Sequence, residues 1–446
     1  MATLAPPSPP SHADQAILGG ISVGSSVVRR ALKYSLFDGM LCAAMVAMLD
    51  TFTIAGAVYL RVPLLAIGIL VGLPLLLSSL GQIFLPYRET RRRWRKKYVL
   101  FGASFQSLLL LVLAFTGFLP STIRPWAYVS VFTLQGFFGN LMTGVWMAWM
   151  GHLVMPEIRG RFFAWRTRII SVAQLASSLF VGALAFRQTN RTTTWLFFLA
   201  IFVAGSLLRL GSTVCIYRQH DPDTAPLPGA EPPQTPKGQR NHFLHYAAAN
   251  ALMLGAVALA GPFFSVWYVR GLQMSYFALS AVVSATVVGV IIALPLWGRL
   301  SDRVGHRNVI VTTALLIAMV PLPFCLTSTV WVLALINVVT GLCWSGYNLS
   351  TFNYLLLLTR GGNPARYNSL AIAMSGVSIF LFSLLGGFLS TRLPTIFAWQ
   401  LQSLFLLSSL VRLTVFSLLF LTLPRDEGRG RPIDFLQFSR RLLNNT

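Results

Sequence analysis

The sequence alternates long apolar stretches with short polar loops, and this pattern decides what the chain can fold into. A membrane-spanning helix needs about 20 predominantly apolar residues, and twelve stretches meet that condition. The expected spans lie near 36–58, 63–86, 98–119, 125–150, 164–186, 194–216, 243–268, 274–297, 308–328, 330–358, 368–390 and 397–423. The sequence therefore predicts an all-α integral membrane protein whose surrounding partner is the lipid bilayer.

Composition supports the same class of protein. Only 11% of the residues are charged, whereas soluble domains carry about 25%. The net charge of +23 could indicate nucleic-acid binding, but the charges sit in short loops between apolar runs. We therefore expect no nucleic-acid partner.

The distribution of basic residues predicts how the chain is oriented. With the N-terminus inside, 27 of the 35 Lys and Arg residues fall in cytoplasmic segments and six fall on the opposite side. Basic residues are enriched in cytoplasmic loops. We expect a multi-pass protein of a plasma membrane, the inner membrane of a bacterium, with both termini in the cytoplasm.

The two halves of the chain look like copies of one another. The Tyr-x-Arg triplet at 59–61 reappears at 268–270, and Asn140 is matched by Asn348, at offsets of 209 and 208 residues. A nearly constant offset indicates duplication and predicts two pseudo-symmetric six-helix bundles. The expected parts are a disordered cytoplasmic tail (1–33), the first bundle (34–216), a cytoplasmic linker (217–241), the second bundle (242–423) and a basic tail (424–446).

Two loops carry a family resemblance. Residues 298–307, Gly-Arg-Leu-Ser-Asp-Arg-Val-Gly-His-Arg, resemble the G-x-L-x-D-R-x-G-x-R signature of the major facilitator superfamily of secondary transporters. Residues 156–161, Pro-Glu-Ile-Arg-Gly-Arg, are similar to its P-x-x-R-G-R element. The resemblance implies twelve helices and transport by alternating access. One departure is the segment 88–97, where the family signature is replaced by a basic run without Gly or Asp.

In the family reading, the signature loop acts as a cytoplasmic conformational latch. Asp302 would accept from the N-terminus of the eleventh span, where an acid gains roughly 0.3–1 kcal/mol. The alternative is a surface acid neutralised by neighbouring arginines, which contributes little. The candidate latch residues are Gly298, Asp302, Arg303, Gly305, Arg307, Arg366 and Arg159.

Asp50 is the candidate coupling residue. It lies near the middle of the first expected span, where an ionised carboxylate costs at least ~2.5–3.5 kcal/mol. Such a residue faces a cavity, pairs with a base or stays protonated. The functional interpretation is proton coupling or substrate contact. The alternative is that the first span ends earlier and leaves Asp50 near the outer surface.

Polar residues in the fourth, fifth and tenth spans are further candidates for substrate contact. They are Gln135, Asn140, Trp146, Gln174, Arg168 and Asn348. The competing interpretations are interhelical hydrogen bonds for the amides and snorkelling to the membrane surface for Arg168. Asp38 is interpreted as a helix-start or interfacial acid. Arg209 and Arg412 occupy matching places in the two halves, which favours a shared structural role.

No enzyme motif stands out, because the sequence lacks a nucleophile elbow, a phosphate-binding loop and a His/Cys/Asp metal cluster. We therefore expect neither enzymatic activity nor a cofactor or metal. The function predicted is secondary active transport of a small organic solute by alternating access, with protons as the expected coupling ion. A lipid or glycolipid flippase on the same scaffold, and a transporter-like sensor that moves nothing, remain alternatives.

Overall fold

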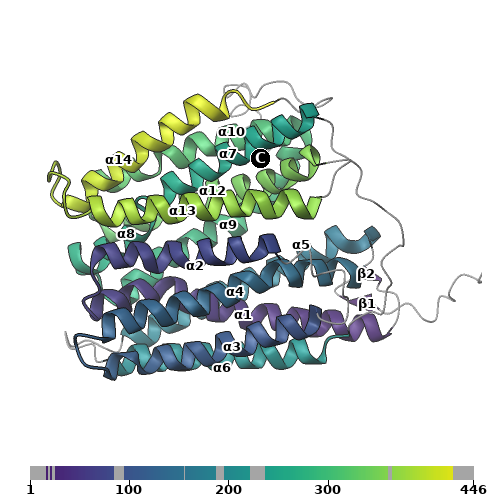
Figure 1. Cartoon of the computed structure of the whole chain (residues 1–446), viewed down its shortest axis with the longest axis horizontal. Coiled ribbons are helices and arrows are strands. Elements are labelled where there is room, and N and C mark those ends of the chain that lie inside the picture. The colour runs from purple at the N-terminus through teal and green to yellow at the C-terminus, as the bar shows by residue number, and fades with distance from the viewer. Residues whose placement is uncertain are drawn as a thin grey trace, which may run out of the picture.

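The computed structural model describes residues 17–18, 21–22, 26–84, 95–154, 156–186, 195–220, 237–359 and 364–424. Most of the expected linker and most of both tails lie outside these residues. Two short strands, β1 (Ile17–Leu18) and β2 (Ile21–Ser22), pair antiparallel near the start of the chain. The rest of the described chain is almost entirely helical (Figure 1).

Six long helices form the first bundle. They are α1 (Ser26–Tyr59), α2 (Leu64–Phe84), α3 (Arg95–Phe115), followed by the short turn η3 (Thr116–Phe118), α4 (Arg124–Leu153), α5 (Pro156–Phe186) and α6 (Trp195–Arg218). The second bundle consists of α7 (Lys237–Ala258), α8 (Gly261–Val266), η4 (Trp267–Gly271), α9 (Tyr276–Val304), α10 (His306–Met319), α11 (Pro321–Leu326), α12 (Val330–Leu358), α13 (Pro364–Leu389), α14 (Gln400–Val415) and η5 (Phe416–Phe420).

The predicted all-α membrane fold is confirmed. Among the described residues, eleven helical segments are long and apolar enough to cross a membrane, and α4 adds a further helix of 30 residues. Two spans that the sequence predicts as continuous are broken: α7 gives way to α8, and α10 to α11, each beside a proline. Apolar length alone cannot reveal these breaks, because broken and continuous helices bury the same residue types.

The first helix begins earlier than the sequence predicts. α1 starts at Ser26 rather than near residue 36, so the end of the expected disordered tail is helical. Asp38 therefore lies twelve residues inside α1, which corrects its interpretation as a helix-start acid. Basic side chains at Arg29, Arg30 and Lys33 mask this extension in a search for apolar runs.

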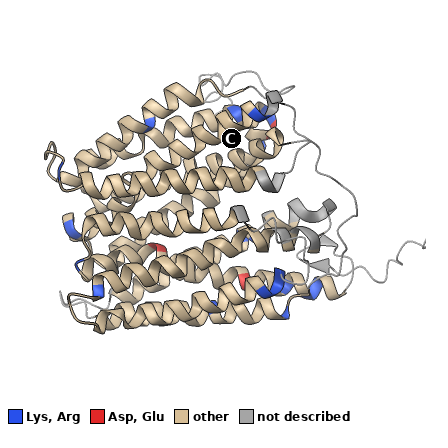
Figure 2. Ribbon diagram, in the orientation of Figure 1, with Lys and Arg blue, Asp and Glu red and all other residues tan. Residues whose placement is uncertain are grey.

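The two bundles lie side by side with their helices roughly parallel (Figure 1). We call the end where α1 begins and α6 ends the termini side, and the end where α1 stops at Tyr59 the far side. Charged residues gather mainly at these two ends (Figure 2). The bundles meet along two seams, between α2 and α13 and between α5 and α9.

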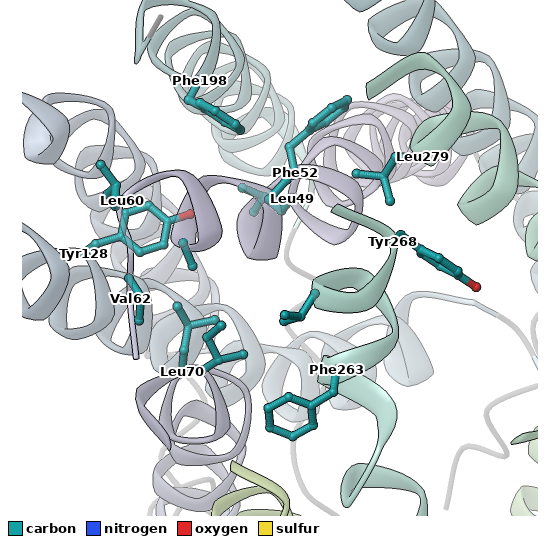
Figure 3. Close-up of a cluster of buried hydrophobic side chains, with 14 of the residues drawn as sticks. Leu49, Phe52, Leu60, Val62, Leu70, Tyr128, Phe198, Phe263, Tyr268 and Leu279 are labelled. Atoms are coloured by element: carbon teal, nitrogen blue, oxygen red, sulfur yellow. The ribbon is translucent and has the colours of Figure 1, made fainter. Parts of the chain in front are cut away.

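A continuous apolar cluster joins the bundles toward the far side. It contains Phe52, Leu60 and Phe198 from the first bundle and Phe263 and Leu279 from the second, all fully buried or nearly so (Figure 3). Tyr276 extends the cluster by stacking on Phe197, with ring centroids 5.7 Å apart. Dense apolar packing of this kind excludes water, so the far side is sealed.

Candidate functional site

A cavity of about 930 Å³ lies between the bundles below the apolar cluster. Its walls come from all six helices α1 to α6 of the first bundle and from α7, α8 and α13 of the second. It extends from the level of Thr53 and Pro262 to Val99 and Ile216, close to the ends of α3 and α6 on the termini side. The cavity therefore reaches one side of the protein and is sealed from the other.

Five of the candidate residues for substrate or coupling line this cavity: Asp50, Gln135, Asn140, Trp146 and Gln174. The Gln106 amide donates to Gln135 Oε1 at 3.2 Å, which fixes the orientation of both side chains. Asn140 donates its amide to the carbonyl of Gly136 in the same helix, so its side-chain oxygen is left for another donor. The cavity wall thus offers several amide groups as hydrogen-bonding partners.

Asp50 lies between two cavities. It lines the large one and also a smaller cavity of about 300 Å³ bounded by α1, α5 and α9. Gln174 is shared by the same two cavities. Because α1 continues to Tyr59, Asp50 is well inside the helix and not at its outer end. Among the described side chains, none forms an ion pair or hydrogen bond with its carboxylate.

Two candidates lie away from both cavity linings. Asn348, the counterpart of Asn140, has an exposed side chain and belongs to neither lining. Arg168 is also exposed and outside both linings. Its place in the wall is taken by Arg166, since Arg166, Ile170 and Gln174 follow one another at four-residue steps. Arg168 is turned from Arg166 by about 200° around the helix.

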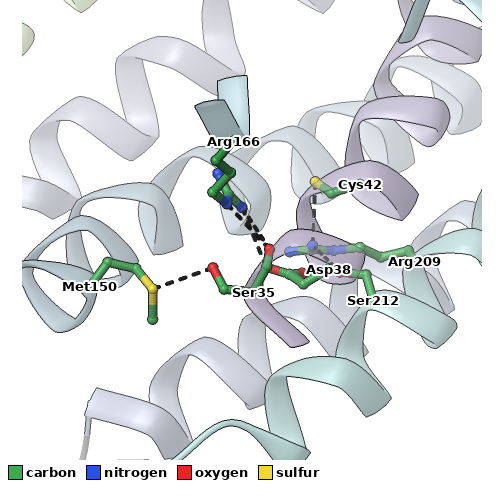
Figure 4. A network of polar contacts seen from close by, with 7 residues as sticks. All are labelled: Ser35, Asp38, Cys42, Met150, Arg166, Arg209 and Ser212. Carbon is green, nitrogen blue, oxygen red and sulfur yellow. Dashed lines mark hydrogen bonds and ion pairs between the residues drawn. The ribbon is translucent and has the colours of Figure 1, made fainter. Parts of the chain in front are cut away.

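A polar cluster that the sequence did not single out lies at the termini side of the cavity (Figure 4). Ser212 of α6 donates a 2.6 Å hydrogen bond to Asp38 Oδ1, and Arg209 Nη1 donates to Ser212 Oγ at 3.0 Å. Arg166 Nη2 lies 4.0 Å from Asp38 Oδ2. The Asp38 carboxylate is therefore approached by Arg166 at one oxygen, and it is linked to Arg209 through the Ser212 hydroxyl at the other.

Arg166 is held in place by two further contacts. Its Nε and Nη2 both donate to the backbone carbonyl of Ser35, at 3.2 and 3.0 Å, and its guanidinium lies 4.5 Å from the Trp146 ring centroid. Arginine stacked on an aromatic face is stabilised by cation–π attraction. Arg166 lies eight residues, two four-residue steps, before Gln174, and this spacing is a signal that could have identified it from the sequence.

The signature loop joins α9 to α10 on the termini side. Gly305 is buried with a φ of 87°, a conformation that favours glycine, and it ends α9 and begins α10. Arg307 donates to the carbonyls of Leu423 and Leu421, at 2.8 and 3.0 Å, and so ties the loop to the end of the last span.

The expected latch contacts of the other loop residues are not formed among the described side chains. Asp302 and Arg303 are exposed, and Asp302 forms no ion pair with any of these. The side chains of Arg159 and Arg366 lie outside the described set. A Cβ placed on Gly298 would meet nothing within 4 Å, so no described helix packs closely against this glycine.

Comparison with known proteins agrees with the architecture. Residues 246–442 match the sequence model of the Major Facilitator Superfamily. A comparison with proteins of curated function found no match. The partially occluded, inward-open xylose transporter XylE from E. coli is 12% identical, with a TM-score of 0.65 over 91% of this chain and 100% of that one.

Two further structures are similar to this chain. The nucleoside transporter NupG is 12% identical with a TM-score of 0.62, over 89% of this chain and 99% of that one. A bacterial homologue of the human lysosomal transporter Spinster, inward-facing and unoccupied, is 13% identical with a TM-score of 0.61, over 90% and 97%. The family-model match lies in the second half of the chain, and it agrees with the resemblance carried by loop 298–307.

Proposed function

We propose that this protein is a secondary active transporter that moves a small organic solute by alternating access between its two bundles. The observation that carries the proposal is the central cavity, which reaches the termini side and is sealed from the far side by the apolar cluster. A cavity at the interface of two repeats is where transporters of this architecture hold their substrates. The xylose and nucleoside transporters of similar fold support the same reading.

The distribution of basic residues indicates which side of the protein faces the cytoplasm. Arg61, Arg124, Arg270 and Arg392 lie on the far side, whereas the more strongly basic loops belong to the termini side. Under the positive-inside rule the termini side is cytoplasmic. The structure then represents the inward-facing state, and the absence of described latch contacts at Asp302 fits an open cytoplasmic side.

Asp50 is the residue we assign to coupling. It is an acid inside the first span, exposed to the cavity and without a described partner for its carboxylate. An intramembrane acid in contact with a water-accessible cavity can bind and release a proton as access alternates. Gln135, Asn140 and Gln174 are assigned to substrate contact, because their amides line the same cavity.

Two other functions fit the scaffold less well. A sensor that moves nothing would have a collapsed interface with Asp50 packed against neighbours, but Asp50 lines two open cavities. A lipid flippase would have an apolar groove, whereas this cavity carries amides and four charged side chains, Asp38, Asp50, Arg166 and Arg209. These observations favour a solute that enters from the aqueous phase.

The test is transport of a metabolite library by purified protein in proteoliposomes, with and without a pH gradient. We expect saturable movement of at least one organic solute, and accumulation only when the gradient is present. If lipid analogues cross between leaflets and no solute is moved, the flippase is correct. If neither moves while a solute still binds, the sensor is correct.

A further inference from the structure

Two arginines at matching positions in the two halves of the protein have different surroundings. Arg209 lies in the sequence Ser-Leu-Leu-Arg-Leu at 206–210, and Arg412 in Ser-Leu-Val-Arg-Leu at 409–413. Both side chains are buried, at 7% and 2% exposed. The two arginines were expected to share a structural role, but only Arg412 has one. The difference comes from the helices that surround each residue.

Arg412 is satisfied by the broken helices of the second bundle. It donates to the carbonyls of Ile317, Val257 and Ala256, at 3.0, 3.4 and 3.5 Å. These carbonyls belong to the last turns of α10 and α7, where helix C-termini leave backbone acceptors without intrahelical partners. A cation at a helix C-terminus is also favoured by the helix dipole. Arg412 thus caps both breaks.

Arg209 has no such carbonyls to cap, because the corresponding helices α1 and α3 are continuous. Among the described residues it donates only through Nη1, to Ser212 Oγ at 3.0 Å and weakly to Cys42 Sγ at 3.5 Å. Its Nε is buried without a described partner, and no described residue accepts a hydrogen bond from Nη2. Arg209 nevertheless contributes to the cavity wall. Unused guanidinium donors in a buried cavity indicate a missing acceptor.

Arg166 brings a second incomplete guanidinium to the same place. Its Nε and Nη2 are occupied by the Ser35 carbonyl, while Nη1 has no described hydrogen bond. Asp38 lies between the two arginines, so the cluster carries two positive charges and one negative charge. A bound monoanion would make it neutral, whereas a dianion would leave a buried negative charge, which is costly.

The side chains around Arg166 and Arg209 indicate what kind of molecule carries the anionic group. Trp146, Ile170 and Ile216 line the cavity around the arginines. We therefore propose that Arg209 and Arg166 form a carboxylate-binding subsite, and that the transported solute is a small organic monocarboxylate with an apolar or aromatic body. Guanidinium groups pair with carboxylates by parallel hydrogen bonds. The claim that this solute is transported rests on the proposed function, whereas the claim that the subsite binds a carboxylate does not.

The experiment is calorimetric titration of the full-length protein in detergent with benzoate, phenylacetate, indole-3-acetate and octanoate, each paired with its neutral amide. We expect at least one carboxylate to bind while its amide does not. Arg209→Gln and Arg166→Gln should each weaken that binding by about tenfold or more, the loss that removing a charge-assisted hydrogen bond produces. Arg209→Lys, which keeps the charge but loses the planar donor pair, should fall in between.

Matched controls separate binding from folding. Arg218→Gln lies on the same helix as Arg209, and Arg168→Gln lies two residues from Arg166; both side chains are exposed and outside the lining. Both controls should bind as wild type, and every variant is first required to elute as a single monodisperse species. The inference is overturned if no carboxylate binds better than its amide, or if Arg209→Gln binds normally. Binding without transport in proteoliposomes would leave the subsite standing and refute the transporter.

Discussion

Ser383 of α13 donates a 2.9 Å hydrogen bond to the backbone carbonyl of Gly68 in α2, and this bond joins the two bundles. The helices can approach so closely only because position 68 has no side chain. A Cβ there would overlap the Ser383 carbonyl, and Gly72 and Gly387 of the same seam are similarly tight against the opposite helix. The second seam has an equivalent bond, in which Ser280 of α9 donates to the carbonyl of Ser178 at 2.6 Å.

Replacing Gly68 by leucine should open the far side. The side chain cannot be accommodated between two backbones, so the state with this seam closed loses stability relative to the state with it parted. The measurement is labelling of Val62→Cys, a buried far-side position, by an impermeant maleimide in a background without the four native cysteines. Labelling should rise severalfold. Gly261→Leu is the control, because a Cβ at Gly261 meets nothing within 4 Å; equal labelling of both variants would refute the steric argument.

Asp50→Asn should separate transport from coupling. Asparagine preserves the size and polarity of the side chain but cannot exchange a proton. We expect exchange of labelled for unlabelled solute to continue, while accumulation driven by a pH gradient falls to the level without a gradient. Parallel flux measurements in proteoliposomes check this, with Asp50→Glu as the control that keeps a titratable group. Normal gradient-driven accumulation by Asp50→Asn would remove this residue from the coupling mechanism.

Asp302→Asn should shift the protein toward the state described here. If Asp302 engages the N-terminus of α13 when the cytoplasmic side closes, its loss removes roughly 0.3–1 kcal/mol from the closed state, about a two- to fivefold change in population. Thr143 lines the cavity, so Thr143→Cys reports on cytoplasmic access by its labelling rate. Asp302→Glu, which keeps the charge, should label as wild type. An unchanged rate in Asp302→Asn means that Asp302 is only a surface acid.

Arg412→Ala should destabilise the fold by about 1.5–3 kcal/mol, since it removes the charge-assisted hydrogen bonds from Arg412 to the backbone carbonyls at the ends of α7 and α10. Ser408 still donates to Ala256 and Ser409 to Ala318, so folding should survive with a lower apparent Tm. Thermal unfolding in detergent measures the effect, and the exposed Arg218→Ala provides the baseline. Two variants with the same Tm would show that the breaks in α7 and α10 do not depend on Arg412.

Much of the scaffold could be predicted because its physics is local. Apolar length, basic loops and the loop 298–307 are visible in the sequence, and together they predict the membrane spans and the family resemblance. The helix breaks could not be predicted in this way, because the capping Arg412 comes from an element about 150 residues later than α7. The two halves share the arrangement of their helices, but this shared arrangement does not determine which side chains form the site.

The site shows this limit most clearly. Asn348 was expected to mirror Asn140, yet only Asn140 lines the cavity, because duplication preserves the position of a residue and not the surface it faces. The Asp38 cluster was missed for another reason. Its members come from α1, α5 and α6, and only the folded bundle brings them within hydrogen-bonding distance. Of these residues, only Arg166 could be recognised from the sequence, because it lies two four-residue steps before Gln174.

The seams of glycine and serine between the bundles have a consequence for the kinetics of the proposed transport cycle. Where two helices touch through their backbones, no side chain can swing aside to admit a solute, and a change of rotamer opens nothing. The α2–α13 and α5–α9 contacts must separate together, by movement of whole bundles as rigid bodies. The passage between states is then an all-or-none event, and a single misfit residue anywhere along a seam should alter its rate.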